Sequence, residues 1–152
     1  MEIHQSAVIL LLIFSVSSFT HGEIPENIKP RYENFLNQHF GPDMTVKNCD
    51  SVIKKRGIIR GGTENGCKEI NSFINANSKD IRAVCEKAGT PQGGDLFKSN
   101  QPFPVITCKL KSGEKHQKCE YRGVSDTRYI VLGCDHGWPV HYDEGIYKPN
   151  NV

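Results

Sequence analysis

The 152-residue sequence lacks the features of a repeat protein, a coiled coil or a zinc-finger domain. It has no internal repeat, heptad pattern or low-complexity block, and no Cys-x-x-Cys pair or compact Cys/His cluster offers metal ligands. No Asn-x-Ser/Thr triplet is present, so we expect no N-linked glycan. Only one long apolar run occurs, near the start of the chain. These absences favour one globular domain.

The apolar run covers residues 7–19 and has the length of the central region of a signal peptide. It is too short to span a bilayer comfortably, and small residues that suit cleavage follow it up to Gly22. Its leading flank carries no Lys or Arg, and the alternative is a buried helix that opens the domain. We predict a signal peptide over residues 1–22 and a secreted domain over residues 23–152.

All six cysteines follow this segment, and an even number in an exported chain predicts three disulfide bonds. Their spacing leaves all fifteen pairings open. The chain has 19 basic and 17 acidic residues, and loss of Glu2 with the signal peptide leaves 16 acidic residues and a net charge of +3. Such a charge permits an anionic partner without requiring one.

Residues 28–40 are a predicted helix, because Tyr32, Phe35, Leu36 and His39 fall on one face. Shorter helices are expected over residues 50–56 and from Ser78, which would be the N-cap. β-branched and aromatic runs separated by turn residues predict four later strands, over residues 105–110, 118–124, 128–133 and 140–147. Helices followed by strands favour an α+β domain with an antiparallel sheet.

Two histidines are candidates for chemistry. His39 lies at the edge of the apolar helix face and is either a packed structural residue or a proton-transfer group, while Gln38 beside it can donate to an anion. His141 and Asp143 stand two residues apart in a predicted strand, so they share a face and the carboxylate can orient the imidazole. An ordinary surface His–Asp pair is the alternative for the second case.

Lys68 follows Cys67 directly, so a disulfide would hold its backbone and keep the ammonium group aimed at one point. Taken alone, this lysine cannot be distinguished from solvated lysines elsewhere in the chain. The segment that contains it, residues 67–73, has the sequence CKEINSF.

The order of these residues among six cysteines resembles the pancreatic-type (ribonuclease A) superfamily. CKEINSF is similar to the family signature C-K-x-x-N-T-F, with Ser72 in place of threonine. Gln38-His39 and the segment PVHYD at residues 139–143 resemble the other two family motifs. Within the superfamily the chain is most similar to the angiogenins, through the basic segment CDSVIKKRG at residues 49–57 and the three-disulfide pattern.

The resemblance implies a monomer with the ribonuclease A-like fold, an α+β domain of three short helices packed on a bent antiparallel β-sheet. It implies cleavage of single-stranded RNA at pyrimidine sites, by transphosphorylation to a 2′,3′-cyclic phosphate. His39 would be the general base, His141 the general acid and Lys68 the charge that stabilises the transition state. Because these groups supply the protons and the charge, no metal and no cofactor is expected. The implied disulfide pairs are Cys49–Cys108, Cys67–Cys119 and Cys85–Cys134.

The resemblance also implies a set of substrate contacts. Gln38 and the backbone near Tyr142 would hold the phosphate, Ser72 would pair with the pyrimidine edge, and Asp135 would touch the base on the 3′ side. Phe73 and Tyr142 would lie near the pyrimidine. The implied substrate-binding residues are Gln38, Asn71, Ser72, Phe73, Asp135, Tyr142 and Asp143.

Two further segments bear on activity and biological role. Glu144 stands where angiogenins have a glutamine that obstructs the pyrimidine pocket, so we hypothesise that Glu144 or the tail after it lowers turnover. The insertion RGGTENG at residues 60–66 lengthens the loop before the lysine motif. Lys54, Lys55 and Arg56 correspond to a run that is a nuclear or nucleolar address in angiogenins. A surface for polyanions and an ordinary solvated helix end are the alternatives.

The sequence therefore predicts a secreted, angiogenin-like endoribonuclease, with a role in angiogenesis and with uptake to the nucleus as further hypotheses. Two other functions remain open on the same scaffold. One is a signalling protein with weak catalysis, which is compatible with the first. The other is an antibacterial host-defence protein that disrupts membranes, for which the net charge is modest.

Overall fold

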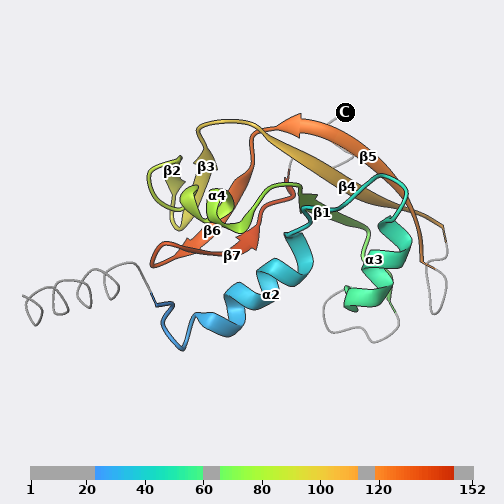
Figure 1. Ribbon diagram of the computed structural model, residues 1–152, viewed down its shortest axis with the longest axis horizontal. Helices are drawn as coiled ribbons and strands as arrows, with labels where there is room; N and C mark the ends of the chain where they lie inside the picture. Colours follow the sequence, from blue (N-terminus) through green and yellow to red (C-terminus); the bar gives the residue numbers. More distant parts are fainter. Residues whose placement is uncertain (1–22, 60–65, 113–118, 146–152) are drawn as a thin grey trace, which may run out of the picture.

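The computed structural model describes residues 23–59, 66–112 and 119–145 (Figure 1). The predicted signal peptide and residues 60–65 of the insertion lie outside the described residues. None of the helices in the described part is long and apolar enough to cross a membrane. The helices and strands, in chain order, are α2 (Lys29–His39), α3 (Cys49–Arg56), β1 (Ile70–Ile74), α4 (Ser78–Ala83), β2 (Gly89–Gly93), β3 (Leu96–Ser99), β4 (Phe103–Ser112), β5 (Glu120–Arg128), β6 (Val131–Asp135) and β7 (Trp138–Tyr142).

The strands form two antiparallel sheets. One has the order β1-β4-β5 and the other has the order β2-β3-β6-β7. The long β4–β5 pair forms a curved arm, and the helices lie below it and at its sides (Figure 1). Helix α2 packs against β7 and β1, so its C-terminal end lies where strands of the two sheets come together. This junction positions the residues of the candidate site.

Local sequence explains where the helices begin and end. Pro30 stands in the first turn of α2, where its missing N–H costs nothing. Helix α3 is terminated by its C-cap Gly57, whose φ of 65° is the left-handed conformation that glycine adopts at low cost. Helix α4 is capped by Asn77, whose Oδ1 accepts from the backbone N–H of Asp80 at 2.8 Å. The predicted cap at Ser78 was therefore wrong by one residue, because the amide of Asn77 already reaches the first turn.

Two apolar cores support the sheets. The first is built around Phe35, Ile81 and Leu132, and it also takes in Ile74 of β1 and Val105 of β4, so it joins α2 and α4 to both sheets. The second is built around Ile53 and Phe73 and lies between α3 and the first sheet. The cores thus pack the helices on the sheets, as the predicted α+β class requires.

Three disulfides connect these parts, and the pairing implied by the family resemblance is confirmed. The loops they close span 59, 52 and 49 residues. In the chain-entropy model each stabilises the fold by roughly 4 kcal/mol. The disulfide pairs are Cys49–Cys108, Cys67–Cys119 and Cys85–Cys134.

The predicted order of helices first and strands later was wrong in one respect. Strand β1 lies between α3 and α4, and it was missed because two of its buried residues, Asn71 and Ser72, are polar. The β2–β3 hairpin was missed as well. It is mostly exposed and turns through Gly93 and Gly94, which both have positive φ.

Candidate active site

His39 is the last residue of α2, and its side chain is only 5% exposed. Its Nδ1 lies 2.8 Å from the backbone carbonyl oxygen of Ser72, and its ring stacks on Tyr142 with 5.1 Å between centroids. A carbonyl can only accept, so Nδ1 carries the hydrogen and donates it, which leaves Nε2 as an acceptor. Burial, and then the charges of Lys68 and His141, lower the pKa of His39 from 6.5 to about 3. The imidazole is therefore neutral near pH 7.

Lys68 lies just before β1 and is half-buried. Its Nζ donates to Oδ1 of Asn71 at 2.7 Å, and Nδ2 of Asn71 donates to the carbonyl of Gln38 at 2.8 Å. Asn71 thereby connects the ammonium group to the C-terminal turn of α2. Burial lowers the pKa of Lys68, while the charge of Glu144 raises it.

The backbone of Lys68 is fixed by a residue that sequence reasoning missed. The hydroxyl of Tyr121 donates to the carbonyl of Lys68 at 2.6 Å, and the backbone N–H of Tyr121 donates to Oδ1 of Asp50 at 2.7 Å. Tyr121 stands two residues after Cys119, the disulfide partner of Cys67. Only the pairing of these cysteines could have pointed to Tyr121 as a neighbour of the lysine.

His141 lies on β7 with an exposed side chain and pairs with Gly133 of β6. A Cβ on Gly133 would come within 3.1 Å of Cβ of His141, so a glycine at this position leaves space for the histidine side chain. The charge of His141 contributes to the lowered pKa of His39, and Tyr142, the next residue in the chain, stacks on the His39 ring. Asp143 lies beyond the end of β7 and accepts from the N–H of Gly145 at 2.9 Å. Among the described residues no hydrogen bond joins Asp143 to His141, so the structure does not bring that predicted pair together.

The backbone and side chain of Ser72 are both engaged by Glu144. Oε2 of Glu144 accepts from the N–H of Ser72 at 2.7 Å, and Oε1 accepts from its hydroxyl at 2.6 Å. The hydroxyl also lies 3.1 Å from Oγ1 of Thr107. Burial raises the pKa of Glu144, and the hydrogen bonds from Ser72 oppose this rise. The donors that the resemblance assigns to a pyrimidine are thus occupied by a carboxylate.

Two residues expected beside the base have other roles. Phe73 is 0% exposed and belongs to the second core, because it follows Ser72 in β1 and points to the opposite face. Tyr142 is 2% exposed and packs on His39, and burial raises the pKa of its phenol to about 12. Neither side chain is accessible to a base in this conformation: Phe73 packs in the second core and Tyr142 packs on His39.

Residues 30–143 match the family model of pancreatic ribonuclease. The chain belongs to the pancreatic ribonuclease family. It is 46% identical over 148 residues to Ribonuclease-like 3 of Danio rerio, covering 96% of this chain and 99% of that protein. It is 37% identical over 145 residues to Angiogenin-4 of Mus musculus, covering 92% and 95%. The solved structure of zebrafish RNase5 matches with a TM-score of 0.78 and 57% identity, covering 81% of this chain and 100% of that chain.

The predicted ribonuclease A-like fold is thereby confirmed, and family membership supports a ribonuclease activity. The part of the chain that the structure describes contains no cluster of three or more His, Cys, Asp or Glu side chains suited to a metal ion.

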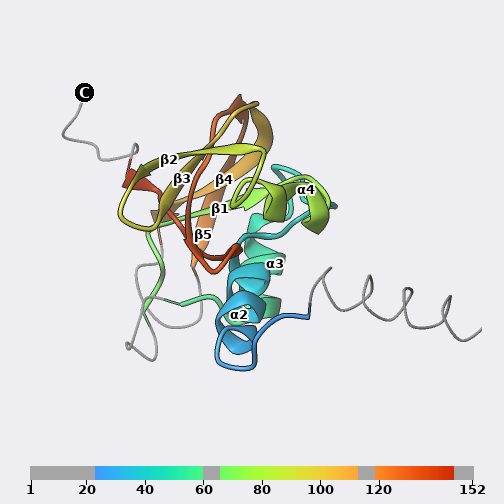
Figure 2. The same ribbon diagram turned by 90° about the vertical axis from the view of Figure 1, so that its left-hand side faces the viewer.

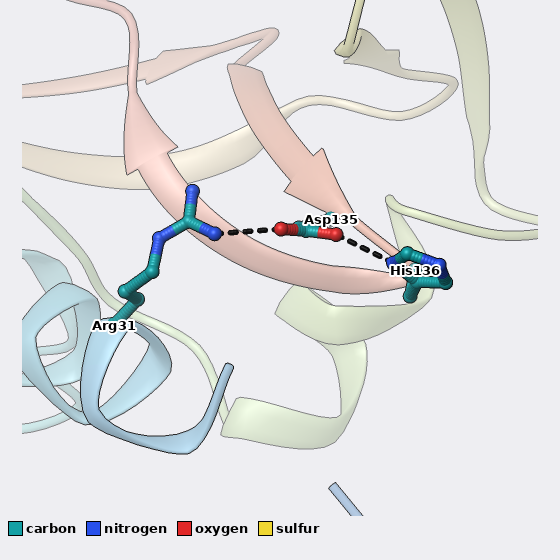
Figure 3. Close-up of polar contacts among 3 residues, drawn as sticks. All are labelled: Arg31, Asp135 and His136. Carbon is teal, nitrogen blue, oxygen red and sulfur yellow. Dashed lines mark hydrogen bonds and ion pairs between the residues drawn. The ribbon is translucent and has the colours of Figure 1, made fainter. Parts of the chain in front are cut away.

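Asp135 lies between two basic side chains (Figure 3). Its Oδ2 accepts from Nη1 of Arg31 at 2.6 Å, and its Oδ1 lies 2.6 Å from Nδ1 of His136. His136 has a positive φ of 50° in the turn between β6 and β7. Hydrogen bonds from His136 and Arg31 lower the pKa of Asp135. The side chain remains 30% exposed, and each carboxylate oxygen can accept a further hydrogen bond.

The basic segment at the end of α3 is not one uniform surface. Lys54 and Lys55 are exposed, whereas Arg56 turns back and donates to carbonyl oxygens at the end of α2. Arg56 thus differs from the two lysines, because its guanidinium group is already engaged within the protein.

Proposed function

We propose that this member of the pancreatic ribonuclease family is a secreted endoribonuclease that cleaves single-stranded RNA on the 3′ side of pyrimidines without a metal. The proposal is supported by two sets of contacts: Asn71 links Lys68 to the carbonyl of Gln38, the residue before His39, and His39 stacks on Tyr142, the residue after His141. His39 donates from Nδ1 and keeps Nε2 as an acceptor, burial keeps its imidazole neutral, His141 is exposed, and Asn71 orients the ammonium group of Lys68.

In the proposed reaction, Nε2 of His39 takes the proton of the ribose 2′-hydroxyl. The 2′-oxygen then bonds to phosphorus, and the bond from phosphorus to the 5′-oxygen breaks. His141, protonated at the outset, gives its proton to the departing 5′-oxygen, so charge and protons balance across the step. The products are a 2′,3′-cyclic phosphate and a free 5′-hydroxyl. Each proton transfer typically contributes about 100- to 10,000-fold.

Lys68 acts on the negative charge that grows on the phosphoryl oxygens in the transition state. Its oriented, partly desolvated ammonium group is suited to this, because a fixed charge in a low-dielectric site does not reorganise during the reaction. Asn71 and Tyr121 hold the side chain and backbone of this lysine in place. Gln38, at the end of α2, and the backbone near Tyr142 are proposed phosphate contacts.

The proposed pyrimidine preference rests on Ser72, whose N–H and hydroxyl match a carbonyl and a ring nitrogen. Glu144 occupies these two donors, so we infer that the base must displace it. The enzyme should accordingly be slow on small substrates, where few other contacts offset this displacement.

A direct test is RNA cleavage in EDTA by the mature, oxidised protein and by three variants, His39→Ala, Lys68→Ala and His141→Ala. Each variant should lose at least about 100-fold in kcat/KM with an unchanged fold. Lys87→Ala is the matched control for the lysine, since Lys87 is exposed. Wild-type protein with correct disulfides but no activity, or variants as active as the wild type, would refute the proposed function.

A second candidate role, angiogenin-like signalling with uptake to the nucleus, is favoured by the 37% identity to Angiogenin-4 of Mus musculus. The exposed pair Lys54 and Lys55 is the proposed address or polyanion surface. Replacing both with Gln should reduce nuclear uptake while RNA cleavage is retained. Loss of both properties together, or of neither, would refute this assignment.

A further inference from the structure

The C-terminal turn of α2 is held by side chains from two other parts of the chain. A helix leaves its last carbonyl groups without partners inside the helix. Here the carbonyl of Leu36 accepts from the N–H of Phe40 at 3.0 Å, and that of Gln38 accepts from Nδ2 of Asn71 at 2.8 Å. The carbonyls of Asn37 and Phe40 both accept from Nη1 of Arg56, at 3.0 Å and 2.7 Å. Arg56 thus engages carbonyls on both sides of Gln38 and His39.

Arg56 is itself fixed at several points. It is the last residue of α3, which lies beside the end of α2 and is joined to β4 by the Cys49–Cys108 disulfide (Figure 2). Its own carbonyl accepts from Nδ2 of Asn37 at 3.1 Å, so the two residues bond to each other in both directions. Its guanidinium group also lies over the ring of Phe73, 5.5 Å from the centroid. A cation at a helix C-terminus interacts favourably with the helix dipole as well.

We propose that Arg56 is a positioning residue for His39, and that it belongs to the catalytic architecture instead of the exposed basic segment formed by Lys54 and Lys55. His39 depends on the last turn of α2 for the contact of Nδ1 with the carbonyl of Ser72, which selects the tautomer. Arg56 links that turn to α3 by hydrogen bonds, and its contact with the ring of Phe73 links it to β1, the strand that carries Ser72. Loosening the turn would let the imidazole move and admit water around it.

Arginine has a specific advantage here. One Nη1 carries two hydrogens and can serve both carbonyls, while the planar group stacks on the ring below. A lysine at position 56 could donate to the same carbonyls, but its compact ammonium group would cover the ring of Phe73 less well. Arg56→Lys should therefore recover part of what Arg56→Ala loses.

The test compares Arg56→Ala and Arg56→Lys with the double variant Lys54→Gln, Lys55→Gln as the matched control from the same segment. The proposal rests on the proposed ribonuclease function, so kcat and KM are measured on RNA at two salt concentrations, and the titration of the His39 imidazole is followed separately by NMR. For Arg56→Ala we expect kcat to fall about 10- to 100-fold with little change in KM and no added salt dependence. The titration midpoint of His39 should rise towards its ordinary value, because water reaches the ring.

Three outcomes would overturn the proposal. The first is an Arg56→Ala protein that melts at lower temperature but keeps the wild-type kcat and His39 titration, since Arg56 would then contribute stability alone. The second is a change confined to KM and abolished by salt, which would make Arg56 an ordinary RNA-binding charge. The third is an equal loss of kcat in the Lys54/Lys55 control. If the wild type cleaves no RNA, the proposed function fails, but the His39 titration still tests the positioning role.

Discussion

Removal of the Glu144 side chain should make the enzyme faster, and the size of the gain follows from two contacts. The carboxylate accepts from the N–H of Ser72 at 2.7 Å and from its hydroxyl at 2.6 Å. Hydrogen bonds to charged groups contribute about 1.5–3 kcal/mol each. Burial of the carboxylate, which raises the pKa of Glu144, opposes this gain. A net preference of about 1–3 kcal/mol for the occupied pocket corresponds to roughly 5- to 150-fold.

A substrate base that must displace Glu144 binds more weakly by that factor, because only the open fraction is competent. Glu144→Ala should therefore raise kcat/KM for a dinucleotide such as cytidylyl-adenosine by roughly 5- to 150-fold. Glu144→Gln is the matched variant. It keeps the length of the side chain and one accepting oxygen but loses the charge, so its gain should be smaller.

The assay is steady-state cleavage of the dinucleotide, with melting temperature measured on the same samples. The fold should be retained, since the N–H and hydroxyl of Ser72 can bond to water in the space that the Glu144 carboxylate leaves. An unchanged or lower kcat/KM in a folded Glu144→Ala protein would show that the carboxylate does not compete with the base.

Three further predictions concern the supports of the site and its pH dependence. Tyr121→Phe removes the donor to the Lys68 carbonyl, so it should lower the free energy of unfolding by about 1–3 kcal/mol and lower kcat at constant KM. An unchanged melting temperature and an unchanged kcat would contradict this. The pKa of His39 is about 3 in the folded protein and 6.5 in the unfolded chain, so below pH 6.5 only the unfolded chain takes up a proton at this site. The free energy of unfolding should therefore fall by about 1.4 kcal/mol for each pH unit below 6.5. Urea unfolding of wild type and His39→Gln at pH 7, 6 and 5 isolates this slope, and equal slopes in both proteins would argue against a buried neutral imidazole. Asp135→Asn should weaken the contact with Arg31 and lower kcat/KM for a dinucleotide. Hydrolysis of cytidine 2′,3′-cyclic phosphate, which has no base on the 3′ side, should be unchanged. An equal effect on both substrates would exclude a role of Asp135 on the 3′ side.

The helix that carries the first histidine could be predicted from the sequence because its apolar residues follow a helical period. Tyr32, Phe35, Leu36 and His39 share a face, and the structure buries Phe35 and His39. Strand β1 could not be found in this way. Its buried Asn71 and Ser72 form hydrogen bonds with Lys68 and Glu144, and polar residues at buried positions interrupt the hydrophobic pattern by which a strand is found.

Contacts between distant segments explain the rest of what the sequence did not reveal. Glu144 reaches Ser72 across 72 residues, and Tyr121 reaches the backbone of Lys68 across 53 residues. The position of Glu144 was suggested by family resemblance alone, whereas its bonds to both donors required the fold. Arg56 belongs to a run of like charges in the sequence, and only the packing of α3 on α2 separates it from Lys54 and Lys55.

The most direct test of the central claim is the ³¹P NMR spectrum of cytidylyl-adenosine during incubation with the mature protein in EDTA. The account predicts that the phosphodiester signal is replaced by that of a 2′,3′-cyclic phosphate. No such signal should arise with His141→Ala or with a substrate that lacks the 2′-hydroxyl. Cleavage of the 2′-deoxy substrate, or product formation that requires a metal ion, would contradict the account.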